Sequence, residues 1–309
     1  MMRRLPIARA GLLLSALALM TAAPAARAQD IEPRAYSNAP IGMNFLIAGY
    51  AYTEGGLSFD SASPISNPKL TTSNAVLAYA RVFEIAGQSA KCDLIAPITW
   101  LDGSADYAGA RVHRDIFGLT DPRFRLSVNF HGGPALALKE FRAYRQRLLV
   151  GGSLQVSVPV GQYDDARLVN LGTHRWYFKP ELGVSRALGR WTLDVAGAVT
   201  LFSDNDAFYQ GTTRSQDPLY SLQGHVIRAF RSGIWGAFDA NYFLGGQVSV
   251  NGMSNGDPQE NWRLGGTLVF PIDVHSSLKL YGSSGVSART GNNFDLAGIG
   301  WQFRWGGGL

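Results

Sequence analysis

The sequence predicts an all-β protein, a transmembrane antiparallel up-and-down β-barrel of about 12 strands, with about 14 as the upper count. Charged residues are only 17% of the 309 residues, whereas soluble domains carry about a quarter. Glycine is abundant at 36 residues, and aromatic residues make up 11%. No stretch after residue 28 approaches the roughly 20 apolar residues of a membrane-spanning helix. An apolar chain without such a helix points to strands that separate lipid from lumen.

The first 28 residues have the pattern of a secretory signal peptide. Arg3 and Arg4 form a basic start, residues 11–23 are apolar, and residues 26–28 form an A-x-A cleavage site. A membrane anchor is the alternative, but the apolar run is too short for one. We expect cleavage near Ala28 and export, with residues 29–309 forming one outer-membrane barrel domain in a Gram-negative bacterium.

The excess of basic residues lies almost entirely in the predicted signal peptide. The whole sequence has 28 basic and 23 acidic residues, a net charge of +5. Four arginines and no acidic residue lie in the first 28 positions, so the rest has 24 basic against 23 acidic residues. A near-neutral domain lacks the clustered positive field that nucleic-acid phosphates require. We therefore expect no nucleic-acid partner.

Twelve segments alternate apolar with polar or small residues, as strands between lipid and lumen must. In one of them Trp176, Phe178 and Leu182 share a face, with polar side chains on the other face. The predicted strands are residues 43–52, 72–84, 91–100, 123–131, 147–158, 174–186, 191–201, 219–230, 234–246, 262–272, 278–287 and 293–305. The alternation is less clean at 72–84 and 219–230.

Connection lengths predict the topology, because outer-membrane barrels have short periplasmic turns and longer outer loops. Short turns fall near residues 86–87, 188–189, 231–233 and 274–276, and long loops near 55–70, 101–121, 160–173, 204–215 and 248–260. If residues 108–118 belong to an outer excursion, the count is even and both termini are periplasmic. Residues 131–146 break the rule, as a long periplasmic connection with a short helical turn. They are either a functional exception or an ordinary long turn.

Residues 29–39 precede the first strand, and the sequence allows an ordered arm, a plug or a frayed terminus. At the other end, Gly300, Trp301, Phe303 and Trp305 resemble the assembly signal of outer-membrane barrels. The four residues after Trp305 depart from that pattern, in which the aromatic residue is last. The expected partners are therefore outer-membrane lipid and the barrel-assembly machinery.

The sequence has no pattern typical of catalysis, metal binding or cofactor binding. The five histidines show no i, i+4 pair and no carboxylate at metal spacing. Residues 251–256 resemble a calcium loop, but its terminal glutamate position falls on Trp262. Nucleophile and phosphate-binding motifs are also absent from the sequence. We expect no enzyme activity, no catalytic residue, no metal and no cofactor.

The polar faces of the predicted strands place charges of both signs in the lumen. Such groups either pair with one another as a polar core or line a translocation path. A 12-stranded barrel is narrower than the 16-stranded porins that hold an open channel. The candidate pore-lining or network residues are Arg123, Arg147, Gln155, Arg175, Lys179, Glu181, Asp194, Asp239, Arg263 and Arg304.

Three central blocks carry a family resemblance: PVGQYD at 159–164, NLGTHRW at 170–176 and KPELG at 179–183. They resemble the meta-pathway phenol-degradation family of outer-membrane proteins, as does the DPR block at 121–123. The resemblance implies a porin-like channel for passive uptake of small hydrophobic or aromatic compounds. The alternative is a closed structural or assembly-related barrel without transport.

The same region suggests a mouth for the barrel. Tyr163, Asp164 and Asn170 fall in a predicted outer loop. Arg175, Lys179 and Glu181 follow on the lumen face of the next strand. This arrangement is either a selectivity element at the mouth and wall or an ion-pair network that locks the loop.

Overall fold

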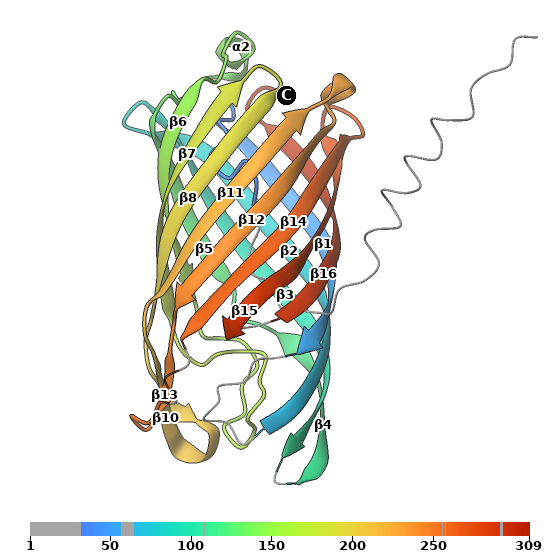
Figure 1. Cartoon of the computed structure of the whole chain (residues 1–309). Helices are drawn as coiled ribbons and strands as arrows, with labels where there is room; N and C mark the ends of the chain where they lie inside the picture. The colour runs from blue at the N-terminus through green and yellow to red at the C-terminus, as the bar shows by residue number, and fades with distance from the viewer. Residues whose placement is uncertain (1–31, 57–64, 108, 255, 257, 291–292) are drawn as a thin grey trace, which may run out of the picture.

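The computed structural model shows an almost entirely β-stranded molecule (Figure 1). It describes residues 32–56, 65–107, 109–254, 256, 258–290 and 293–309. The predicted signal peptide, residues 1–28, lies outside the described residues. Among the described residues, no helix is long and apolar enough to cross a membrane.

The described residues form sixteen strands and three short helical turns. The strands are β1 Met43–Gly56, β2 Ile65–Ile85, β3 Gln88–Tyr107, β4 Ala110–Leu119, β5 Arg123–His131, β6 Leu148–Ser157, β7 Tyr177–Leu188, β8 Trp191–Phe202, β9 Asn205–Phe208, β10 Thr212–Gln216, β11 Leu219–Ala229, β12 Trp235–Gly245, β13 Val248–Val250, β14 Gln259–Pro271, β15 Ser276–Thr290 and β16 Asn293–Gly306. The helical turns are α2 Leu138–Phe141, η2 Tyr209–Gly211 and η3 Arg231–Gly233.

The main sheet closes into an antiparallel barrel of 12 strands, as the sequence predicts. Neighbours in the ladder run β2-β1-β16-β15-β14-β12-β11-β8-β7-β6-β5-β3, and β2 pairs again with β3. Each of the twelve predicted segments overlaps one barrel strand. The segment predicted at 174–186 begins earlier than β7, so Arg175 precedes that strand and does not lie on it. Closure gives every edge a partner, which removes the free edges of an open sheet.

The predicted outer excursion at 108–118 is also confirmed, and it takes the form of an extra strand. β3 pairs with β5 over Ala90–Ile95 and then with β4 over Ile98–Tyr107. β2 and β3 are longer than the sequence predicts, with a ladder that begins at the pair Ile65 and Tyr107. The alternation between lipid and lumen faces is lost where strands leave the membrane, so the pattern cannot follow them there.

Burial along the strands is the reverse of that in a soluble protein. In β7, Glu181 and Ser185 are buried, whereas Phe178, Leu182 and Val184 are exposed. Exposed apolar and aromatic side chains recur on nearly every barrel strand. A transmembrane barrel has this arrangement because its outer face contacts lipid, whereas its polar groups point into the lumen.

The two ends of the barrel differ. The short-turn end carries α2 and the C-terminus, at the top of Figure 1. The long-loop end, at the bottom, carries β4 and a separate sheet of β9, β10 and β13. The connection at 131–146 is long and contains the predicted helical turn as α2. It lies over the short-turn end, where the Gly133 carbonyl accepts a hydrogen bond from the Ser89 amide (2.8 Å).

Candidate functional site

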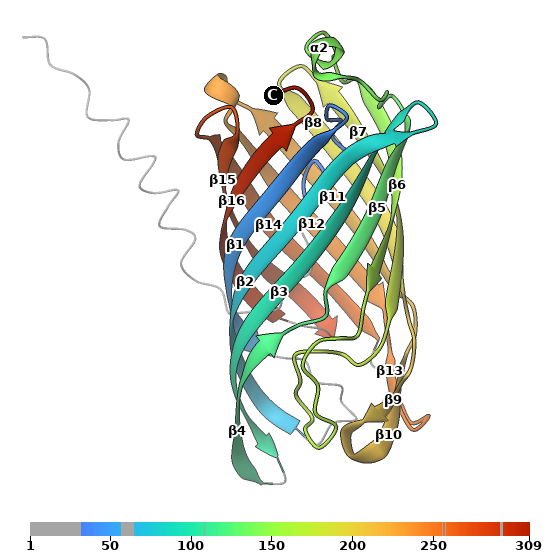
Figure 2. The ribbon, with the colours of Figure 1, turned by 180° about the vertical axis from the view of Figure 1, so that it is seen from behind.

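The described residues before β1, from 32 to 42, lie inside the barrel, in the half nearer the short-turn end (Figure 2). We call residues 32–42 the arm. Its last residues are tied to the barrel by backbone hydrogen bonds, from the Ile41 amide to the Leu136 carbonyl and from the Gly42 amide to the Val82 carbonyl, both 2.9 Å. For residues 29–39 the sequence allowed an ordered arm, a plug or a frayed terminus. The described part of this segment, residues 32–39, is an ordered arm.

A cluster of charges holds the start of the arm. Arg125 of β5 donates to Glu32 Oε1 (2.9 Å) and to Oε2, and its Nε donates to Asp93 Oδ2 (2.8 Å). Lys91 Nζ lies 4.0 Å from Asp93 Oδ1 and donates to the Ala35 carbonyl (3.3 Å). Arg125 is thus bound on one side by the wall and on the other by the arm. Such charge-assisted hydrogen bonds are among the stronger polar contacts in proteins.

The middle of the arm fits a recess in the wall. Tyr36 is buried, with its ring against Gly151 of β6 and Gly183 of β7, which face each other in the ladder. A Cβ atom on Gly183 would lie 2.2 Å from the ring, and one on Gly151 would lie 2.5 Å from it. Only glycine at these two positions leaves room for the ring, so the recess is built to accept the arm.

Glu181 of β7 connects the arm to β11. Its Oε1 accepts a hydrogen bond from the Tyr36 hydroxyl (2.9 Å). Its Oε2 accepts one from Gln223 Nε2 (2.8 Å) and lies 3.4 Å from Lys179 Nζ. Asp194 of β8 similarly accepts a hydrogen bond from the Arg34 amide (3.0 Å). Three of the sequence-predicted lumen residues, Lys179, Glu181 and Asp194, therefore lie in one network with the arm.

A second group of buried polar side chains lies on β11 to β15. Asp239 lies 2.6 Å from His225 Nδ1 and accepts a hydrogen bond from Thr267 (3.1 Å). Arg263 is fully buried, with its Nε donating to Ser283 (2.9 Å) and its Nη2 to the Phe294 carbonyl (2.9 Å). Asp239 and Arg263 are thus on the lumen side of the wall, as the alternation predicts, and each contributes to joining neighbouring strands.

The remaining sequence-predicted lumen residues are spread along the barrel. Gln155 is buried and donates to the Tyr177 hydroxyl (2.8 Å). Arg123 is half-buried at the start of β5. Arg147 is exposed and immediately precedes β6. Arg304 is half-buried near the short-turn end, where its Nε donates to the Val274 carbonyl (2.8 Å). Gln155 stands opposite Lys179 in the β6–β7 ladder, next to the Glu181 network, whereas Arg147 and Arg304 lie toward the short-turn end.

Residues 158–176, the mouth loop, fold across the long-loop end (Figure 2). Asp121, which precedes β5, holds both sides of this loop. Its Oδ1 accepts a hydrogen bond from the Gly161 amide (2.9 Å), and its Oδ2 accepts two from Thr173, from the amide (2.7 Å) and the hydroxyl (2.6 Å). Val169 and Leu171 add apolar contacts with a small cluster of Leu70, Leu101 and Ile116. The loop is therefore anchored to the wall by both polar and apolar contacts.

The three predicted mouth residues all lie in this loop and act within it. The Tyr163 hydroxyl accepts a hydrogen bond from Asn205 Nδ2 (2.9 Å) and donates to the Ala207 carbonyl (3.1 Å). Asn170 accepts from the Asp164 amide (3.0 Å) and donates to the Asp164 carbonyl (2.9 Å). These contacts close the loop with hydrogen bonds and join it to β9.

Arg175 lies at the base of the mouth loop and is buried. Its Nη2 donates to Gln216 Oε1 (2.5 Å), and its guanidinium carbon lies 4.4 Å from the centre of the Phe202 ring. Among the described residues, no carboxylate lies within 4.0 Å of this guanidinium, and its Nη1 has no hydrogen-bond partner. Arg175 is thus a buried cation held by a neutral amide and an aromatic ring.

The contacts of several residues in this site could not be predicted from the sequence. Glu32 and Tyr36 belong to a segment without strand alternation, and their partners are 93 and 145 residues away. Asp121 lies in a short connection between β4 and β5. Only the recess could have been predicted from the sequence, because Gly151 and Gly183 are glycines on predicted lumen faces. No local pattern indicated that a ring fills it.

Similarity to known proteins agrees with this architecture. An outer membrane channel from Pseudomonas putida F1 aligns with TM-score 0.75 and 18% identity, covering 89% of this chain and 100% of that one. The β domain of the Bordetella autotransporter Brka aligns with TM-score 0.53 and 14% identity, over 86% and 100%. The transport unit of the autotransporter AIDA-I from Escherichia coli gives 0.50 and 10%, over 96% and 97%. At these identities the likeness shows the outer-membrane barrel fold.

Comparison with curated proteins gives no match. A family model does match, over residues 54–303, which is most of the barrel. The chain therefore belongs to the family described as "Putative MetA-pathway of phenol degradation".

Proposed function

We propose that the protein is a passive outer-membrane channel for the uptake of small hydrophobic or aromatic compounds, and that it is not an enzyme. The fold it shares with an outer membrane channel supports transport. Membership of a family named for phenol degradation supports an aromatic solute. The wall residues Arg123, Gln155, Lys179 and Glu181 would line the path, and the mouth loop with Tyr163, Asp164 and Asn170 would border its outer opening.

One observation carries the proposal, namely that a separate segment of the chain fills the recess in the barrel wall. A barrel without transport can fill its interior with wall side chains. Here Gly151 and Gly183 leave a recess, and Tyr36 of the arm occupies it. The arm is held by hydrogen bonds and ion pairs, so its displacement opens space while the closed β-ladder stays intact.

The test compares ion and solute passage through the full barrel and through a barrel with a released arm. The mature chain is refolded beside a variant in which residues 32–40 are replaced by a Gly-Ser sequence of equal length. We expect a several-fold larger conductance in planar bilayers for the Gly-Ser variant. We also expect faster entry of phenol into liposomes that contain either protein than into empty ones.

The other candidate is a closed structural barrel, and the dense pairing around Glu181 favours it. If neither the mature chain nor the Gly-Ser variant shows conductance or phenol flux, transport is refuted and the closed barrel is supported. Lys179→Gln separates the two candidates in the intact protein. In a channel it changes conductance or ion selectivity, whereas in a closed barrel it only lowers the thermal stability.

A further inference from the structure

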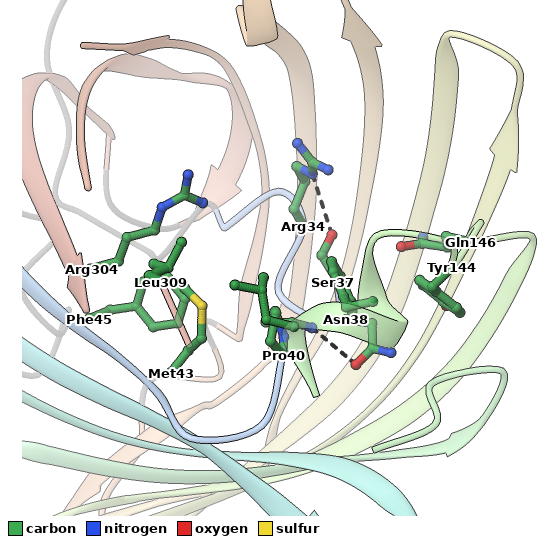
Figure 3. Close-up of a pocket in the computed structure, with 13 residues that line it drawn as sticks. Arg34, Ser37, Asn38, Pro40, Met43, Phe45, Tyr144, Gln146, Arg304 and Leu309 are labelled. Carbon is green, nitrogen blue, oxygen red and sulfur yellow. Dashed lines mark hydrogen bonds between the residues drawn. The ribbon is translucent and has the colours of Figure 1, made fainter. Parts of the chain in front are cut away.

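A pocket of about 440 Å³ opens at the short-turn end of the barrel (Figure 3). Its volume is within the range of small-molecule sites, about 300–1,000 Å³. Its walls come from the arm, the start of β1, the connection at 131–146 and the C-terminal residues. Three of these segments are the ones to which the sequence assigned no definite role.

The walls are held in place by contacts between those segments. Asn38 Nδ2 of the arm donates to the Pro134 carbonyl (3.0 Å), and the Ile41 amide donates to the Leu136 carbonyl (2.9 Å). The Tyr144 hydroxyl donates to the Gly132 carbonyl (2.7 Å). The pocket is therefore shaped by ordered backbone, which is what a binding site requires.

Two guanidinium groups give the pocket its charge. Arg34 and Arg304 both line it, and no aspartate or glutamate side chain does. Leu309, the last residue of the sequence, also lines it and carries the terminal carboxylate. Arg34 donates weakly to Ser37 (3.4 Å) and lies 5.1 Å from the Trp235 ring, while Arg304 donates through Nε to the Val274 carbonyl. Asp194 and Asp273 act on them from further away, since no described carboxylate lies within 4.0 Å of either guanidinium.

The rest of the lining is largely apolar and aromatic. Figure 3 shows Pro40, Met43 and Phe45 below the two arginines, with Tyr144 across the pocket. Phe141 also lines it, with its ring 5.5 Å from that of Tyr144. Arginine recognises carboxylates with paired donors, and aromatic side chains pack against flat rings. The lining combines both kinds of recognition.

We propose that this pocket binds a small aromatic carboxylate, with the carboxylate at Arg34 and Arg304 and the ring on the apolar side. As the substrate class of the channel the proposal rests on the proposed function, but binding itself does not require transport. A neutral phenol would leave the two cations without an anion, and an alkyl carboxylate would lose the ring contacts. Both should bind less well than benzoate.

The experiment is equilibrium dialysis of radiolabelled benzoate against the mature chain refolded in a nonionic detergent, at neutral pH and low salt. We expect saturable binding to the wild type and at least tenfold weaker binding to Arg304→Gln and to Arg34→Gln. Arg231→Gln is the matched control, because Arg231 is exposed at the same end and does not line the pocket. Migration of the folded barrel on unheated gels verifies that each variant is folded.

Benzoate that binds wild type and Arg304→Gln equally, or that fails to bind wild type, would overturn the proposal. Phenol or hexanoate that competes as well as benzoate would overturn the stated ligand class. Liposome flux separates this result from the proposed function. Benzoate binding without any flux refutes the channel and keeps the pocket, whereas phenol flux without benzoate binding does the reverse.

Discussion

Two arginines on the lumen side of the barrel show how its two halves differ. Arg125, at the level of the arm, is held between Glu32 and Asp93. Arg175, at the base of the mouth loop, contacts Gln216 and the Phe202 ring. The first cation is neutralised by a carboxylate that the arm brings into the barrel. The second is buried with no carboxylate within 4.0 Å among the described residues, and it is held by a neutral amide and an aromatic ring instead.

The largest expected effect comes from removing the neutralised cation. Arg125→Gln leaves the buried carboxylate of Asp93 without its closest cation, beside the carboxylate of Glu32, whose side chain is 38% exposed. Breaking a buried pair costs about 3–5 kcal/mol, and the exposure of Glu32 places the expected loss at the lower end, about 3 kcal/mol. Arg175→Gln removes no ion pair, and we expect a loss below about 1.5 kcal/mol, near that of one hydrogen bond. Urea unfolding of the two refolded variants measures both values.

The same pair of variants also differs in ion selectivity. Arg175→Gln should shift the reversal potential in a salt gradient toward cations, because a cation leaves the mouth. Equal losses of stability with unchanged selectivity would show that the two arginines have the same structural role, contrary to the comparison.

A substitution in the Tyr36 recess tests the role of the arm in the half of the barrel nearer the short-turn end. Gly183→Leu places a side chain where the Tyr36 ring lies, so the arm must leave its seat. We expect a several-fold increase in single-channel conductance. Gly197→Leu is the control, since Gly197 is exposed and a Cβ there meets only the Ser221 carbonyl oxygen, at 4.0 Å. Unchanged conductance in Gly183→Leu would mean that the arm does not limit passage.

At the mouth, the corresponding change is Asp121→Asn. It weakens the hydrogen bonds to Gly161 and Thr173, at a cost of about 1–3 kcal/mol. Because the mouth loop would open more often, trypsin should cleave faster after Arg167, which is exposed in the loop. Asp115→Asn, at an exposed position on β4, should leave the cleavage rate unchanged. Equal rates for both variants would contradict the anchoring role of Asp121.

The smallest effect is expected in the turn between β14 and β15, outside the membrane-spanning strands. The backbone amides of His275 and Ser276 donate to Asp273 and lower the pKa of its carboxyl group. A lowered folded-state pKa stabilises the protein above the unfolded value of about 3.9, and the contribution is lost as the pH falls through the folded value. Asp273→Asn should slightly lower the unfolding temperature at pH 7 and leave it unchanged at about pH 2. A loss of the same size at both pH values would contradict this origin.

The barrel itself could be predicted from the sequence because its cause is local. Residues 191–201 alternate apolar with polar or small side chains, and β8 spans Trp191–Phe202. The same alternation placed Asp194, Asp239 and Arg263 on the inner face, and all three are buried. A strand between lipid and lumen needs this period of two, so each segment carries its own evidence.

The contents of the barrel could not be predicted in the same way. Glu32 pairs with a residue 93 positions away, and Tyr36 fits between glycines of two different strands. The sequence showed glycines on lumen faces, but nothing in their neighbourhood indicates which side chain fills the space. The mouth loop was similar, since Asp121 contacts residues 40 and 52 positions further along the chain.

The sequence by itself determined that the chain forms an antiparallel barrel of about 12 strands, which face of most strands meets lipid, and where the short turns lie. Only the tertiary structure decided that the arm enters the lumen, that Arg125 is neutralised and Arg175 is not, and that three undetermined segments enclose one pocket. The physical reason is the range of the forces involved. Lipid acts on every strand separately, whereas ion pairs and packed rings form only where the closed barrel brings distant residues together.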